Sequence, residues 1–211
     1  MRLTTEATLA IEASILGGSV TVRAGGKVHT YSGDPPSAAK AEFLLPKIDE
    51  LIRESGISRH EIKTIVVSAG PGSFTGIRIG ISTALGLARA VGAKVRIIPV
   101  LAAIASASKG IVCASIPVGR GMIASQIFEV TDHAITAPES PILHSAMNEL
   151  RGQLQNLAIE HLITANGIEI EDGLNCPATE AGVLSELLAS AAEDPRVPDS
   201  DPIFLSKPHN A

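Results

Sequence analysis

The stretch Val66–Gly80, VVSAGPGSFTGIRIG, decides how the rest of this 211-residue chain is interpreted. A β-branched run, Ile65–Val67, leads into Gly70-Pro71-Gly72, and a segment rich in small residues follows. Glycine accepts a positive φ and proline fixes its own φ, so these residues predict a tight turn. Ser73 or Thr75 can cap a following helix by accepting from its free N–H groups. The stretch therefore predicts a strand, a glycine turn and a helix, a unit whose helix start often binds an anion.

Three familiar glycine motifs do not describe this turn. A Walker A loop requires G-x-x-x-x-G-K-[ST], but Gly70 and Gly76 are one residue too far apart and Ile77 replaces the lysine. A dinucleotide fingerprint requires G-x-G-x-x-G, and a nucleophile elbow requires G-x-S-x-G; neither spacing occurs here. The remaining interpretation is a loop shaped for close approach of backbone.

Composition narrows the class of protein. Hydrophobic residues make up 45% of the chain and charged residues 18%, which indicates a globular protein. Aromatic residues are only 2% and the formal net charge is −5, whereas RNA-binding surfaces use stacking rings and clustered cations. Any contact with tRNA is therefore expected to be indirect. No signal peptide or membrane span is evident in the sequence, so we expect a cytoplasmic protein without membrane contact.

Hydrophobic periodicity predicts two α/β lobes, over residues 1–107 and 108–211, the second smaller and ending in a turn-rich tail. The expected strands cover 8–13, 19–23, 27–31, 62–68, 94–99, 111–115, 123–130 and 160–165. The expected helices cover 38–54, 76–91, 101–108, 145–157 and 179–192. The order in the first lobe is that of one lobe of the actin-like superfamily.

The segment Gly70–Gly80 matches G-P-G-S-F-T-G-[LIV]-R-[IV]-G at every position, which is the signature of the TsaB (YeaZ) family of tRNA threonylcarbamoyladenosine biosynthesis proteins. Leu9–Ser14, Glu42–Pro46 and Ala84–Ala88 also resemble that family, so the resemblance covers roughly residues 8–108. It implies an actin-like (ASKHA) fold of two lobes, each a mixed sheet flanked by helices, with the second lobe reduced. The second lobe departs from the family at Ile116–Ala124, where the expected Asp, Glu and Tyr are lost.

The resemblance implies a non-catalytic subunit that scaffolds a TsaD-like transferase, with a TsaE-like ATPase as a further partner. The catalytic relative binds a metal through H-x-x-x-H, but no two histidines of this chain are four residues apart. We therefore expect no metal, no cofactor and no catalytic residue. The alternative is an independent actin-fold, ATP-dependent phosphotransferase, with Glu12 at the end of the first strand and Gly17 and Gly18 near the nucleotide.

The helix expected at 76–91 carries a stripe of small residues at Gly76, Gly80, Ala84 and Ala88. This stripe is open to two interpretations, packing against the chain's own helix 38–54 or a close seam between subunits. The resemblance implies the seam and places the following residues at or near it: Leu45, Ile48, Gly76, Arg78, Gly80, Ile81, Thr83 and Ala84. Without its partner the chain is expected to form a homodimer through the same helices, and a self-associating scaffold unconnected with tRNA is a third alternative.

Overall fold

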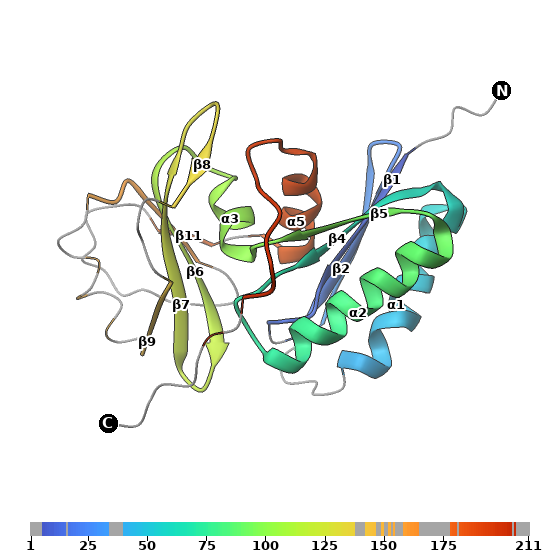
Figure 1. Ribbon diagram of the computed structural model, residues 1–211, viewed down its shortest axis with the longest axis horizontal. Coiled ribbons are helices and arrows are strands. Elements are labelled where there is room, and N and C mark those ends of the chain that lie inside the picture. Colours follow the sequence, from blue (N-terminus) through green and yellow to red (C-terminus); the bar gives the residue numbers. More distant parts are fainter. Residues whose placement is uncertain are drawn as a thin grey trace.

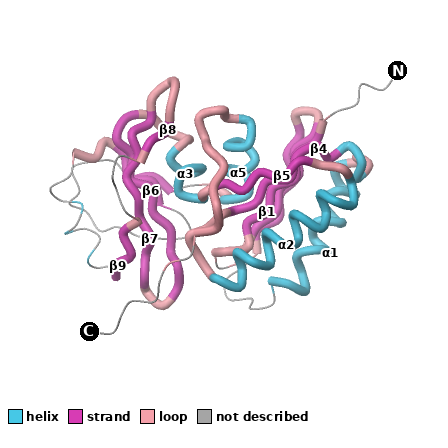
Figure 2. The backbone as a smooth tube through the Cα atoms, in the orientation of Figure 1, coloured by secondary structure: helices cyan, strands magenta, loops and turns pink. Residues whose placement is uncertain are grey.

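The computed structural model describes residues 6–203 and 205, except 16, 34–39, 138–141, 147–148, 150–151, 153, 155–157, 165–177 and 181. Its architecture is layered, with two sheets that enclose a helical layer and a pair of helices outside the first sheet (Figure 1). Figure 2 shows the same layers as two magenta sheets separated by α3 and α5, with α1 and α2 on the outer side. No helix in the described ranges has the length and apolar character needed to cross a membrane.

The first sheet has the strand order β3-β2-β1-β4-β5. Its strands are β1 (Ala7–Glu12), β2 (Ser19–Ala24), β3 (Lys27–Ser32), β4 (Ile62–Ser68) and β5 (Lys94–Ile98). The first three form an antiparallel meander, and β4 and β5 extend it in parallel. Parallel strands need crossover connections, which α1 (Lys40–Ser55) and α2 (Phe74–Val91) provide on the outer face.

The second sheet has the order β11-β10-β6-β7-β8, and β9 pairs with β7. Its strands are β6 (Gly110–Gly119), β7 (Met122–Val130), β8 (Ile135–Thr136), β9 (Leu143–Ala146), β10 (His161–Thr164) and β11 (Ala178–Glu180). The hairpin of β6 and β7 is its longest feature, and β10 and β11 add in parallel beside β6. The predicted mixed α/β class with one sheet in each lobe is confirmed.

The helical layer contains α3 (Val100–Ala105) and α5 (Leu184–Glu193), and it joins the sheets into one core. Ala10, Val66 and Ile98 of the first sheet share a buried cluster with α3, α5 and the inner face of the second sheet. Because α5 packs on β1 and β2, residues after 183 return to the first sheet. Strands β1–β5 precede residue 108 and strands β6–β11 follow it, while α5 from the second half of the sequence packs on the first sheet.

Some element boundaries differ from the sequence prediction. The helix expected at 179–192 begins at Leu184, because residues 178–180 pair with β10 as an edge strand. The strand expected at 111–115 continues to Gly119, since its pairing with β7 extends that far. The helix expected at 145–157 falls largely outside the described residues, and its first two positions belong to β9. A short 3₁₀ turn, η1 (Arg59–Glu61), precedes β4.

Candidate functional site

The glycine turn of the signature packs tightly against the chain's own β1–β2 loop. Ser73 caps α2 by accepting from the Gly76 N–H at 3.2 Å, as one of the two predicted caps. The Ser73 N–H donates to the Ser14 carbonyl at 2.7 Å. A Cβ added at Gly76 would lie 2.1 Å from the Ala13 carbonyl oxygen, far closer than a carbon atom can pack. The absence of a side chain at Gly76 thus allows the backbone of the neighbouring β1–β2 loop to pack against the start of α2.

Gly70 likewise allows the backbone of a C-terminal segment, residues 200–203, to pack closely against the turn. Its φ is +92°, a left-handed value that favours glycine, and an added Cβ would lie 2.7 Å from the Ile203 carbonyl oxygen. The Ile203 N–H donates to the Ala69 carbonyl at 2.7 Å, and the Ser200 N–H donates to Ile97 at 2.8 Å. The segment is anchored further by Arg96, whose guanidinium donates to Asp199 and to carbonyls of α5 and residue 197. The loop is therefore a junction of three backbone segments, and the close approach of backbone expected from the motif occurs here.

Glu12, the carboxylate expected near a nucleotide, is 1% exposed at the end of β1. Its Oε1 accepts from the Ser14 N–H at 2.6 Å, from the Ser14 hydroxyl at 2.6 Å and from the Ile15 N–H at 3.0 Å. These bonds hold the chain in the β1–β2 turn, which also contains Gly17 and Gly18. The Gly18 carbonyl accepts from the Gly33 N–H at 2.9 Å. The carboxylate is thus engaged as a structural acceptor within its own loop.

A small cavity of about 30 Å³ lies between this turn, β3 and α1. Glu12, Gly17 and Gly18 line it together with Tyr31 and Lys47. The Lys47 ammonium donates to Glu50 at 2.7 Å and lies 5.0 Å from the centre of the Tyr31 ring. The hydrogen bond to Glu50 raises the pKa of Lys47. The described residues contain no cluster of three His, Cys, Asp or Glu side chains placed to hold a metal ion.

The stripe of small residues on α2 faces inward. Gly76, Gly80 and Ala84 are buried, and Ala84 belongs to the core cluster with β1 and β4. A Cβ at Gly80 would lie 3.2 Å from Val67 of β4. Ile48 of α1 is likewise only 2% exposed. These four residues therefore do not face outward, which corrects the expectation that the stripe itself forms a seam: it lets α2 lie close to its own sheet.

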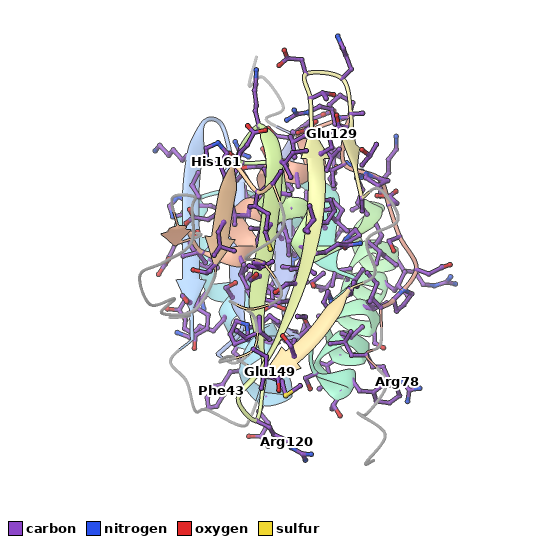
Figure 3. All side chains as sticks on the ribbon, turned by 90° about the vertical axis from the view of Figure 1, so that its left-hand side faces the viewer. Phe43, Arg78, Arg120, Glu129, Glu149 and His161 are labelled. Carbon is purple, nitrogen blue, oxygen red and sulfur yellow. The ribbon has the colours of Figure 1, made fainter. Side chains whose placement is uncertain are left out.

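The other predicted contact residues lie on the outer side of the helices. Leu45 is 51% exposed, Arg78 is exposed, and Ile81 and Thr83 are half-buried. Three exposed apolar side chains that the sequence analysis missed join them: Phe43, Phe74 and Leu85. The Arg78 guanidinium lies 3.9 Å from the centre of the Phe74 ring. Figure 3 shows Phe43 and Arg78 at the same end of the molecule.

Four larger side chains of α2, three of them exposed and one half-buried, have a regular spacing. Phe74, Arg78, Ile81 and Leu85 are separated by four, three and four residues, so they form one narrow stripe along the helix. The same spacing sets the apolar seam of two packed helices in a coiled coil. The outer side of α2 thus has the pattern of a helix that receives another helix. This spacing was the signal from which Phe74 and Leu85 could have been found.

The chain has recognisable relatives. The family model of TsaD, tRNA N6-adenosine threonylcarbamoyltransferase, matches residues 29–192. The tRNA threonylcarbamoyladenosine biosynthesis protein TsaB of Haemophilus influenzae is 34% identical over 92 residues, which are 44% of this chain and 38% of that protein. TsaB of Escherichia coli is 36% identical over 80 residues, 38% of this chain and 34% of that protein. The matched segments thus span little more than a third of these curated relatives.

The fold has a solved counterpart in YeaZ from Pseudomonas aeruginosa, with a TM-score of 0.68 over 95% of this chain and 100% of that one. At 20% identity the likeness shows the fold, which is actin-like as the resemblance implied. The family match, by contrast, covers most of the chain. The chain therefore belongs to the family that the TsaD model describes, and part of its length is similar to TsaB proteins.

Proposed function

We propose that this chain takes part in threonylcarbamoyladenosine biosynthesis in tRNA, as a non-catalytic partner of a TsaD-like transferase. The names of the TsaB relatives indicate the process, and the family match indicates the transferase reaction. In the proposed complex the transferase performs the chemistry, a TsaE-like ATPase joins it, and tRNA is held through these partners. The proposed compartment is the cytoplasm.

The observation that carries this proposal is the two-sided character of α2. Its inner side packs on β1 and β4 through Gly80, Ala84 and neighbouring residues, so that side is already buried within the protein. Its outer side nevertheless exposes Phe74 and Leu85 by 50% and 52%, at the spacing that packs a second helix. Large apolar side chains grouped on one exposed face are typical of protein–protein interfaces. A partner helix laid along α2 would bury them.

The hydrogen bonds accepted by the Glu12 carboxylate favour a partner role over the phosphotransferase alternative. A carboxylate that coordinates a nucleotide's metal ion must present its oxygens to the cavity. Here Oε1 already accepts three hydrogen bonds from Ser14 and Ile15. Removing Glu12 is expected to disorder the β1–β2 turn, because buried N–H groups would lose their acceptor.

The central test is genetic. Depletion of the chain in its native cell should lower the threonylcarbamoyladenosine content of tRNA, measured by mass spectrometry of nucleosides. Wild-type protein should restore the modification, whereas Leu85→Glu should not, since a charge on the apolar stripe blocks helix packing. The matched control is Ala90→Glu, an exposed position on another side of the same helix, which should restore it. Unchanged modification after complete depletion would refute the proposed function.

A second test concerns catalysis by the isolated chain. Purified protein with Mg²⁺ and ATP should release no phosphate above a buffer control. Hydrolysis that disappears in Glu12→Gln, while the protein stays folded by circular dichroism, would instead establish the phosphotransferase alternative.

A further inference from the structure

The tip of the β6–β7 hairpin holds an arginine in a backbone conformation that disfavours it. Gly119 pairs with Met122, so Arg120 and Gly121 form a two-residue turn. Their φ values are +57° and +71°, and Arg120 is the only described non-glycine residue with a positive φ. Turns of this kind need a positive φ at both positions and strongly favour Asn, Asp or Gly at the first. Arginine there costs about 1 kcal/mol in backbone energy.

No contact among the described residues compensates for that cost. Arg120 is exposed, and it makes no hydrogen bond, ion pair or ring contact with the described residues. A Cβ at Gly119 or Gly121 would meet nothing within 4 Å, so the tip projects clear of its surroundings. Residues that oppose their local backbone preference without an internal benefit are expected at functional sites.

A second arginine at the same end also opposes its local structure. Arg78 lies one turn into α2, where a cation is unfavourable beside the positive end of the helix dipole, and the first turn has no acidic residue. In Figure 1 the hairpin tip and the first turns of α1 and α2 lie at the lower end of the molecule. Figure 3, turned by 90°, keeps Arg120 at that end with Arg78 and Phe43. Both views therefore place the tip at the end of the molecule where α1 and α2 begin.

We propose that Arg120 is a second-lobe contact for the protein partner that covers α1 and α2, and that it binds a carboxylate of that partner. This inference rests on the proposed function and extends the interface across both lobes. Arg120 is an interface residue with no part in the fold, and its guanidinium offers the planar donors that carboxylates accept.

A protein carboxylate suits this surface better than an RNA phosphate backbone. RNA binding requires clustered cations. Here the surface also carries exposed Glu42 and Glu149 besides the two arginines, and the net charge of the chain is −5. The neighbouring apolar residues Phe43 and Phe74 also favour a protein surface.

The test compares stability with binding in Arg120→Gly, because the two effects have opposite signs. Glycine suits the turn, so the melting temperature should rise by about 2 °C. The dissociation constant for the TsaD protein of the same source should nevertheless increase about tenfold, with a weaker salt dependence. The matched control is Arg89→Ala, which removes the same charge near the far end of α2 and should leave affinity within about twofold.

Each other result overturns the inference in a distinct way. A raised melting temperature with unchanged affinity would mean that Arg120 is merely tolerated. Equal losses in Arg120→Gly and Arg89→Ala would indicate long-range charge effects instead of a contact. Loss of binding to a tRNA anticodon stem-loop, with TsaD affinity intact, would make RNA the occupant. Failure of the wild-type chain to bind TsaD would refute the proposed function together with this inference.

Discussion

Two glycine-rich turns of this protein look alike in sequence and behave in opposite ways. The signature turn at residues 70–76 is closed, and added Cβ atoms at its glycines would collide with Ile203 or with Ala13 and Ser14. The hairpin tip at residues 119–121 is open, and added Cβ atoms there would meet nothing. The first turn locks backbone segments together, whereas the second holds a side chain away from the protein. Glycine content alone therefore does not distinguish a packing junction from a projecting turn.

The largest expected effect comes from a substitution at a buried position of α2, the helix that follows the closed turn. Ala84→Arg should unfold the protein, because Ala84 is 0% exposed between α2 and the first sheet and a buried, unpaired guanidinium costs several kcal/mol. Leu85→Arg, one residue further and 52% exposed, should change the free energy of unfolding by less than about 0.5 kcal/mol. Thermal melting of both variants by circular dichroism measures the difference. A near-native melting temperature for Ala84→Arg would show that the stripe faces outward after all.

The next effect compares the two turns directly. Gly76→Ala should destabilise the protein by about 3 kcal/mol, because its Cβ would lie 2.1 Å from the Ala13 carbonyl and backbone must shift. Gly121→Ala has open space and should cost only about 1 kcal/mol, for its φ of +71°. Urea denaturation of both variants gives the two values. Equal costs would contradict the distinction between a closed and an open turn.

A smaller effect concerns the ion pair of Asp194 and Arg196, which lies just after α5. The Arg196 guanidinium donates to Asp194 at 2.7 Å and lowers the pKa of that carboxyl. The folded protein therefore binds fewer protons there, so this pair stabilises the fold above the ordinary aspartate pKa of about 3.9 and loses its effect as the pH falls further.

Asp194→Asn should therefore cost about 1 kcal/mol at pH 7 and almost nothing at pH 2. The exposed pair of Asp49 and Arg53 is the control, and Asp49→Asn should cost less than about 0.5 kcal/mol at either pH. Urea denaturation at the two pH values gives these costs. The same loss for Asp194→Asn at both pH values would rule out the charge as its cause.

Local periodicity was sufficient for much of the first lobe. The alternating strands around 19–31 and the run Ile65–Val67 predicted β2, β3 and β4, and Ser73 predicted the start of α2. Such local patterns do not predict which elements pack together over long range. A stripe such as Gly80 and Ala84 fits a sheet as well as a partner helix, so its direction depends on what the fold places beside it.

The candidate site was predictable in part for the same reason. The sequence indicated Leu45 and Arg78 correctly as residues of the two outer helices, but it could not show that Ile48 turns inward beside them. It placed Glu12 at the end of β1, while the three hydrogen bonds that engage its carboxylate arise from the β1–β2 turn. The return of α5 to the first sheet joins residues more than 160 positions apart, which no local pattern encodes.

The most direct test of the partner role is the affinity of Leu45→Glu for the TsaD protein of the same source, measured by calorimetry beside thermal melting. Leu45 is 51% exposed, whereas its neighbour Leu44 is 8% exposed and serves as the buried control. Leu45→Glu should keep a near-native melting temperature and lose at least about 100-fold in affinity, as expected for an apolar interface anchor. Native affinity in a folded Leu45→Glu variant would contradict the partner role.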